Sequence, residues 1–131
     1  MATIDITTEG NLLIATVTGN ISAGELIAVV LEYYPNNIVK DVLWDLTNGS
    51  LQSISQDGFK TIAKTTKMSM AGGSRRGGKT AFVGSTDSEY NLSSFYKVVA
   101  EVTGVPVKYN VFKTIEEARS WLGRERFEPA V

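Results

Sequence analysis

A short apolar run in the middle of the chain constrains the fold more than any other feature. Residues 42–46 (Val-Leu-Trp-Asp-Leu) are almost continuously apolar and rich in strand formers. Such a run is typical of a strand that is buried on both faces, and strands of this kind occur mainly in parallel sheets covered by helices. The run therefore predicts an α/β protein with this strand at the centre of its sheet.

Strand and helix patterns alternate along the rest of the chain. Two β-like runs joined by a short Gly/Asn turn predict an N-terminal hairpin, and each later strand is followed by a helix. The predicted strands cover residues 2–8, 12–18, 42–46, 80–84 and 105–112. The order β-β-α-β-α-β-α-β-α implies a mostly parallel mixed sheet, with its first strand antiparallel at an edge, and four helices. We expect one domain over residues 1–123 and a flexible charged tail at 124–131.

Capping residues predict where the helices begin. Ser22 and Thr114 are each followed three residues later by Glu, which is the capping-box pattern, and Ser53 is followed by Gln at the same spacing. Asp87 or Ser88 is the predicted cap of the third helix. Spacing predicts which side chains of the second and third helices point inward, namely Phe59, Ile62, Ala63 and Thr66, then Leu92, Phe95, Val99 and Val102.

The first helix is apolar on nearly every side. A helix of this kind is either buried on more than one side or part of a subunit interface. We therefore predict that a homodimer could form through the face that carries Leu26, Val30, Tyr33 and Tyr34.

Two absences narrow the chemistry. The chain has no Cys and no His, which removes thiol nucleophiles, the commonest general base and the commonest ligands of transition metals. We expect no enzyme activity, no metal site and no cofactor. We also expect a cytoplasmic protein without a membrane span, because no apolar run is long enough to cross a bilayer and no signal peptide is recognisable.

The charges are distributed unevenly, although the net charge is only −1. Residues 1–57 contain one base and seven acids, whereas residues 58–80 contain six bases and no acid. This basic segment predicts contact with an anionic partner. We do not expect nucleic acid to be the partner, since no aromatic residues interleave with the basic residues. The candidate anion-contacting residues are Lys60, Lys64, Lys67, Arg75, Arg76 and Lys79.

Residues 73–80 (Gly-Ser-Arg-Arg-Gly-Gly-Lys-Thr) match the P-loop pattern G-x-x-x-x-G-K-[ST]. A phosphate-binding P-loop requires a strand before the loop and a helix that starts at the Lys-Ser/Thr pair. Here a predicted helix precedes the loop and a predicted strand follows it. We therefore interpret the match as fortuitous, and the loop either as simply mobile or as an anion-contacting loop.

The element order and the ending Glu-Glu-Ala-Arg-Ser-Trp-Leu at residues 116–122 resemble one family. Residues 4–122 are similar to the STAS domain of the sporulation anti-sigma-factor antagonists, and more so to their bacterial SpoIIAA-like relatives. In such proteins a serine of an Asp-Ser-Ser-Gly motif, in the loop after the central strand, is phosphorylated to release a kinase-like partner. Without gaps, this motif falls on residues 53–56, and Ile54 takes the phosphorylated position. The candidate regulatory loop contains Asp45, Thr47, Asn48, Ser50, Ser53 and Ser55.

The resemblance implies a non-enzymatic regulatory module that binds a protein partner. An alternative is a small-molecule binder for an anionic or lipid-like ligand, because the Sec14-like lipid-binding architecture is similar in outline. A third is a hydrolase-type enzyme that uses Asp45 with a Lys or Ser.

Overall fold

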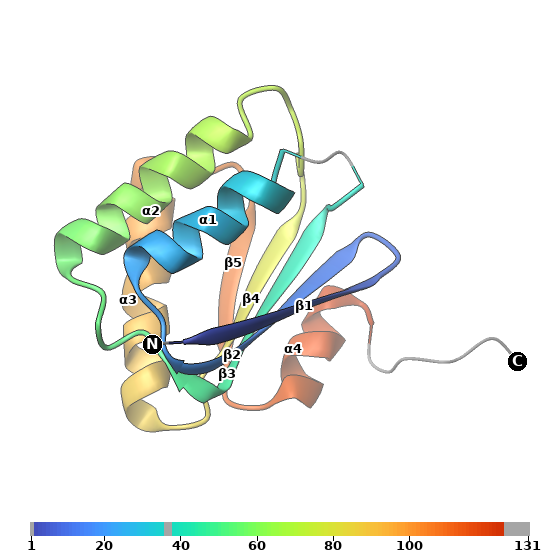
Figure 1. The fold of residues 1–131 in the computed structure, drawn as a ribbon. Coiled ribbons are helices and arrows are strands. Elements are labelled where there is room, and N and C mark those ends of the chain that lie inside the picture. The colour runs from blue at the N-terminus through green and yellow to red at the C-terminus, as the bar shows by residue number, and fades with distance from the viewer. Residues whose placement is uncertain (1, 36–37, 125–131) are drawn as a thin grey trace, which may run out of the picture.

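The computed structural model describes residues 2–35 and 38–124. The helices and strands follow the predicted order (Figure 1). The strands are β1 (Thr3–Glu9), β2 (Leu12–Asn20), β3 (Asp41–Ser50), β4 (Lys79–Val83) and β5 (Lys108–Phe112). The helices are α1 (Ala23–Tyr33), α2 (Gln56–Ser69), α3 (Asp87–Thr103) and α4 (Ile115–Leu122). The strands form one sheet in the order β1-β2-β3-β4-β5, so β3 is central and the antiparallel β1 lies at an edge, as predicted.

Helices cover both faces of the sheet. Helices α1, α2 and α3 lie on one side and α4 lies on the other (Figure 1). Alternate residues of the central strand divide between the two cores: Trp44 packs under the three helices, and Leu43 packs toward α4. This arrangement explains why residues 42–46 are nearly continuously apolar, since both faces of β3 are buried.

Strand β3 is longer than predicted. Asn48 and Gly49 were expected to form a turn, but they continue the strand and pair with Thr18 and Gly19 of β2 after a register shift. A Cβ added at Gly49 would lie 2.7 Å from the carbonyl oxygen of Val17. Gly49 is therefore required here by the close approach of the two strands and not by a turn.

The predicted helix caps are correct at two helices and wrong at the other two. Ser22 and Thr114 cap α1 and α4. Helix α2 begins after Ser55, whose side chain accepts from Gly58 N–H, rather than after Ser53. Helix α3 begins after Thr86, not Asp87 or Ser88. Both errors arise because several neighbouring residues could cap equally well by type, and the geometry of the incoming chain selects one of them.

The predicted inward face of α2 is correct, whereas that of α3 is correct only in part: Leu92 and Val99 are partly buried against the core, but Phe95 and Val102 are exposed. The buried residues of α3 are Glu89, Ser93, Tyr96 and Ala100. Ser93, Tyr96 and Ala100 each follow directly after a residue that was predicted to point inward. Tyr96 fills the interface with edge-on ring contacts to Phe82 and Tyr109. Large apolar residues of α3 are consequently exposed, with Val98 at 55% and Val102 at 83%.

Strand β5 begins three residues later than predicted. Gly104 ends α3 in the left-handed conformation, with φ of 85°, and Val105 N–H bonds back to Ala100. Val107 N–H then bonds to the carbonyl of Val105, so residues 105–107 form a turn around Pro106. The chain joins the sheet only at Lys108.

The predicted dimer face of α1 is largely unavailable. Leu26, Val30 and Tyr34 have 4%, 1% and 2% of their surface exposed, because they pack into the core of the same molecule. Trp44 Nε1 also donates to the hydroxyl of Tyr34 at 3.1 Å. Of the four residues proposed for this face, only Tyr33 is partly exposed. The apolar character of α1 therefore reflects its burial against the sheet and α2.

Candidate interaction surface

The six predicted anion-contacting residues do not form one surface. Lys60, Lys64 and Lys67 lie exposed along α2, whereas Arg75 is buried and Lys79 is partly buried in β4. Arg76 is exposed in the loop between α2 and β4. The basic segment of the sequence thus divides into an outward-facing helical part and a largely inward-facing loop part.

Arg75 is an internal brace of the fold. Only 3% of its surface is exposed. Its Nε donates to the carbonyl of Lys40 at 3.0 Å, and Nη2 donates to the carbonyl of Lys79 and to the hydroxyl of Thr80. The guanidinium also lies 4.5 Å from the ring centre of Tyr34. These contacts join the loop to the chain before β3, to β4 and to α1, so Arg75 is not available to an anion outside the molecule.

Burying Arg75 constrains the loop and its neighbours. Arg75 has φ of 57° and is the one non-glycine among the described residues with positive φ. Its Nη1 is buried without a hydrogen-bond partner. Burial raises the pKa of the Tyr34 hydroxyl, and the nearby Arg75 charge opposes this shift. The loop, which was expected to be either mobile or anion-contacting, is therefore anchored at its centre by a strained, buried cation.

The P-loop-like residues have structural roles. Lys79 Nζ donates to the carbonyl of Trp121 at 2.9 Å and lies over the Trp121 ring, and Thr80 accepts from Arg75. Helix α2 precedes the loop and strand β4 follows it, so no helix begins at Lys79-Thr80. This is the arrangement expected from the sequence, and it lacks the helix N-terminus that a phosphate-binding P-loop needs.

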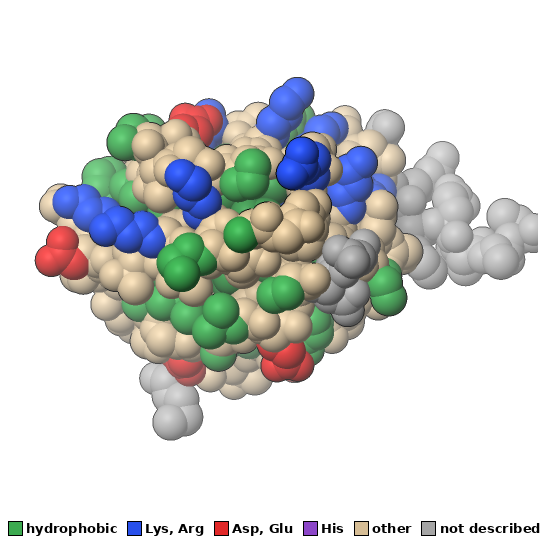
Figure 2. All heavy atoms as spheres, turned by 90° about the horizontal axis from the view of Figure 1, so that it is seen from above, with side chains coloured by type: hydrophobic (Ala, Val, Ile, Leu, Met, Phe, Trp, Pro, Cys, Tyr) green, Lys and Arg blue, Asp and Glu red, His purple; other side chains and the backbone are tan. Residues whose placement is uncertain are grey.

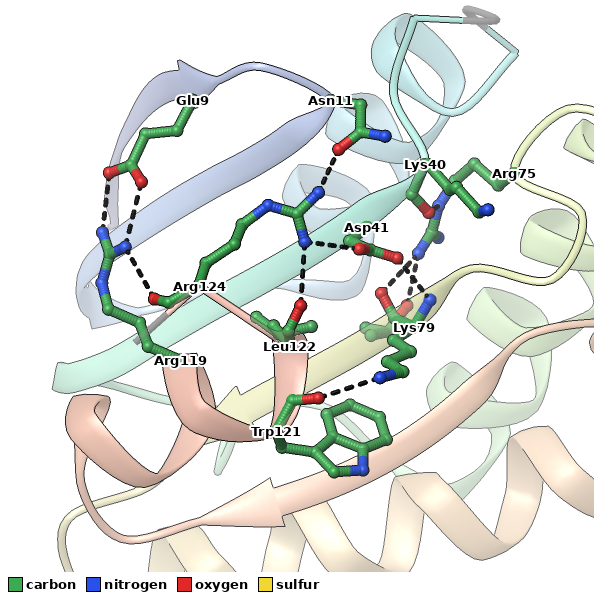
Figure 3. A network of polar contacts seen from close by, with 11 residues as sticks. Glu9, Asn11, Lys40, Asp41, Arg75, Lys79, Arg119, Trp121, Leu122 and Arg124 are labelled. Atoms are coloured by element: carbon green, nitrogen blue, oxygen red, sulfur yellow. Dashed lines mark hydrogen bonds and ion pairs between the residues drawn. The ribbon is translucent and has the colours of Figure 1, made fainter. Parts of the chain in front are cut away.

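The amino-terminal end of the sheet is closed by a network of paired charges (Figure 3). Buried Asp41 accepts from Lys79 N–H at 2.8 Å and from Arg124 at 2.6 Å. Arg124 also donates to the side chain of Asn11. Arg124 was expected in a flexible tail, but it belongs to the folded unit; residues 125–131 of that tail lie outside the described residues.

A second ion pair of the same network joins the ends of the folded chain. Arg119 in α4 forms two hydrogen bonds with Glu9 at the end of β1, at 2.7 and 3.0 Å. The hydrogen bond to Arg119 is the main reason that the pKa of Glu9 lies below its usual value. This end of the sheet therefore holds the fold together and offers few unpaired charges.

The candidate regulatory loop lies at the opposite, carboxyl end of β3. Asp45 Oδ1 accepts from both the backbone and the hydroxyl of Thr47. Ser50 Oγ donates to Glu89 of α3 at 2.7 Å, and Leu51 N–H donates to the same carboxylate at 2.9 Å. Only 8% of the surface of Glu89 is exposed. The sequence did not single it out, because an acidic residue in the first turn of a helix is common. The carboxylate fixes the start of the loop to α3.

The remaining loop residues differ in their availability. Ser55 is committed to capping α2, whereas Asn48 and Ser53 are exposed. Ile54, at the position that the resemblance equates with a phosphorylated serine, is 6% exposed and packs in the core. The loop is thus well ordered by internal contacts, and Ser53 is exposed without capping a helix.

An open groove runs between α2 and α3, and the sequence did not reveal it. Its larger part has a volume of about 790 Å³, and a second part of about 270 Å³ shares Lys64 and Thr103 with it. The apolar lining comes from Met68, Met70, Ala71, Pro106, Val98, Val99 and Val102. Met68 is 76% exposed, so the groove and its rim form an uncovered apolar surface.

The exposed lysines of α2 border this groove. Lys60, Lys64 and Lys67 are spaced by four and three residues, which places them along one side of the helix. Lys67 Nζ donates across the groove to the carbonyl of Thr103, while Lys60 and Lys64 have no ion pair with any described residue. Figure 2 shows hydrophobic side chains lying among Lys and Arg side chains on the face that includes α2. We call the groove and these lysines the α2–α3 surface.

Comparison with known proteins identifies the fold. No family model matches the chain, and no curated protein matches it. A solved structure of an uncharacterised protein with a SpoIIAA-like fold from Shewanella loihica PV-4, of the DUF3478 family, aligns over 92% of this chain and 93% of its own, with TM-score 0.56 and 15% identity. An anti-sigma factor antagonist from Mycobacterium paratuberculosis aligns over 94% and 95%, with TM-score 0.60 and 16% identity.

The anti-sigma factor antagonist SpoIIAA in its unphosphorylated form is also similar. It aligns over 92% of this chain and 98% of its own, with TM-score 0.53 and 10% identity. No described helix has the length and apolarity needed to cross a membrane. The agreement in element order and sheet topology confirms the resemblance seen in the sequence at the level of the fold: this chain has a SpoIIAA-like α/β fold.

Proposed function

We propose that this protein is a non-enzymatic, cytoplasmic regulatory module that binds a protein partner through the α2–α3 surface. The observation that carries the proposal is the apolar groove bordered by lysines that form no ion pair with any described residue. Contiguous exposed apolar surface next to charged residues marks interaction sites in otherwise well-packed proteins. The partner is a protein that presents apolar side chains together with Asp or Glu.

The distribution of exposed apolar residues supports this site. Met68, Val98 and Val102 all belong to α2 or α3 and are more than half exposed. The opposite face of each helix is well packed, so exposure here does not reflect a loose core. Lysines beside an apolar surface favour acidic partners, since opposite charges steer association and disfavour basic competitors.

The chemistry of the other polar residues supports a role in binding. Asp45 is hydrogen-bonded within its own strand end, and Lys79 is bonded to α4. The chain contains no His or Cys that could serve as a base or nucleophile beside them. The similar structures named anti-sigma factor antagonists give a precedent for regulation by this fold.

We also propose that the loop after β3 supports the surface rather than forming it. Glu89 ties the first turn of α3 to Ser50 and Leu51, and Ser55 starts α2 a few residues later. The two helices that line the groove are therefore positioned by one loop. A change at Ser53, the exposed hydroxyl, would act on the partner through this loop.

The test is affinity capture from an extract of the source organism, comparing wild type with two matched variants. Val102→Asp places a charge in the groove, and Leu31→Asp makes the same change at an exposed position of α1, 57% exposed. Both sites are exposed, so both variants should fold normally. We expect a defined protein to be retained by wild type and Leu31→Asp and lost from Val102→Asp, with titration showing at least tenfold weaker binding.

Equal capture by all three proteins would contradict the α2–α3 surface as the binding site.

Native mass spectrometry of the purified protein addresses the alternative of a small anionic or lipid-like ligand. A bound small molecule that disappears in Val102→Asp would replace the proposed protein partner with a ligand in the same groove. Activity toward model ester or phosphate substrates that is lost in Asp45→Asn would contradict a non-enzymatic role.

A further inference from the structure

Strand β1 leaves one edge of the sheet unpaired. It pairs with β2 on one side and is the last strand in the sheet order, so its other edge meets no strand among the described residues (Figure 1). All seven residues, Thr-Ile-Asp-Ile-Thr-Thr-Glu, pair with β2 in continuous register without a bulge. The strand is therefore a regular template for a further strand.

This edge has few of the features that usually prevent pairing between molecules. Proteins protect sheet edges with Lys, Pro, bulges, very short strands or a covering element. Strand β1 contains none of these residues or bulges, and its acidic residues are Asp5 and Glu9. Glu9 is held by Arg119 of its own chain. Asp5 is thus the main charge that restricts which strand can add here.

We propose that β1 pairs antiparallel with β1 of a second copy, with Ile6 on the two-fold axis. A two-fold axis perpendicular to the sheet keeps each face continuous, so residues opposite each other must both have even or both have odd numbers. In the proposed register Ile6 faces Ile6, Ile4 faces Thr8, Asp5 faces Thr7 and Thr3 faces Glu9. All seven residues of the strand take part, and the two sheets join into one.

The charges select this register over its neighbours. Sliding the strands by two residues in one direction places Asp5 opposite Asp5. Sliding them by two in the other direction places Asp5 opposite Glu9, twice in the symmetric pair. Like charges directly opposite each other destabilise a strand pair, and only the central register of the three avoids them.

The central register also brings apolar side chains together. Ile4 and Ile6 are half-buried, and they pack on the edge of the core that α1, α2 and α3 cover. Pairing about Ile6 brings the two copies of this isoleucine together and extends that apolar layer across the axis. This inference uses β1 alone and is independent of the α2–α3 surface.

Cysteine cross-linking tests the register, because the chain has no native Cys. In Ile6→Cys the two introduced residues lie directly opposite each other with Cα atoms about 4.5–5.5 Å apart, which is within the range of a disulfide. Thr8→Cys places the introduced side chain on the same face of the sheet. The two Cys residues are then offset by four residues along the strands, roughly 14 Å, which is too far for a disulfide. We expect mild oxidation to give dimers from Ile6→Cys and at least tenfold less from Thr8→Cys.

Charge variants at Thr7 test the pairing without a cross-link. Thr7 is exposed and lies opposite Asp5 of the second copy. Thr7→Asp creates two like-charge pairs and should weaken dimerisation in sedimentation experiments by at least tenfold, whereas Thr7→Lys creates two opposite-charge pairs and should strengthen it several-fold. Melting temperatures close to wild type would show that both variants fold. A monomer at all concentrations up to several hundred micromolar, or equal cross-linking of both Cys variants, would overturn the proposal.

Discussion

The two parts of the basic segment have opposite surroundings. On α2, Lys60 and Lys64 extend into solvent beside an apolar groove and have no ion pair with a described residue. In the loop that follows, Arg75 and Lys79 bind carbonyl groups of their own chain. The first part can contact another molecule, and the second part holds α1, β4 and α4 in place.

The difference shows that a cluster of like charges in a sequence is not automatically a binding surface. A lysine on the outer face of a helix has few carbonyls within reach, because the helix uses its own; of the three lysines on α2, Lys67 reaches one, at the end of α3. The loop from Ala71 to Gly78 crosses the end of the sheet, where strand and helix ends present free carbonyls. Arg75 donates to two of these at once, the carbonyls of Lys40 and Lys79, and this accounts for its burial without a carboxylate partner.

The largest effect is expected from Arg75→Met. The substitution keeps an apolar stem but leaves the carbonyls of Lys40 and Lys79 without their donor, so the free energy of unfolding should fall by about 3 kcal/mol. Urea denaturation measures the change. Arg76→Met, at the exposed neighbour, should stay within about 0.5 kcal/mol of wild type; equal losses would mean that Arg75 does not brace the fold.

The next effect concerns the outward-facing lysines. Lys60→Glu combined with Lys64→Glu should weaken binding of the captured partner by ten- to a hundredfold and change stability by less than about 1 kcal/mol. Calorimetric titration at two salt concentrations measures both affinity and its electrostatic part. The same charge change at Lys40 and Lys108, which are exposed elsewhere, is the control. If the control weakens binding equally, the effect is one of net charge and not of the α2–α3 surface.

A smaller effect is expected at Lys79, the residue that a functional P-loop would need for phosphate. Lys79→Ala removes the bond to Trp121 and should lower the free energy of unfolding by about 1 kcal/mol. Wild-type protein should show no binding of ATP by equilibrium dialysis. Saturable ATP binding that Lys79→Ala abolishes would show that the loop contacts an anion outside the molecule, and would contradict its purely structural role.

The smallest effect is the acid dependence contributed by Glu9. Its pKa is lowered in the folded state by Arg119, so its contribution to stability is present above the unfolded-state pKa, about 4.3, and is lost as pH falls through the folded-state value. Glu9→Gln should therefore lower stability by up to about 1 kcal/mol at pH 7 and by less below pH 4. Thermal unfolding across this range checks the sign. A loss that grew toward low pH would contradict the assigned ion pair.

The errors at helix α3 show why the fold was predictable from sequence but the surface was not. Phe95 and Val102 were assigned to the core from their helical spacing, yet both are exposed, and α3 buries Glu89 and Ser93 instead. The helix is rotated because Tyr96 fills the space over the sheet and Glu89 reaches the loop after β3. Both contacts are with residues distant in sequence, and no local periodicity encodes them.

The sequence by itself determined the element order, the central strand, the hairpin edge and the rejection of the P-loop, because these depend on local periodicity, turn residues and the order of strand and helix. The tertiary structure decided which bases face solvent, where α3 exposes apolar residues, and that Arg75 and Glu89 are buried. Those outcomes depend on which carbonyls, rings and amide groups are brought together by folding. A side chain's type limits its contacts, but its neighbours in space select among them.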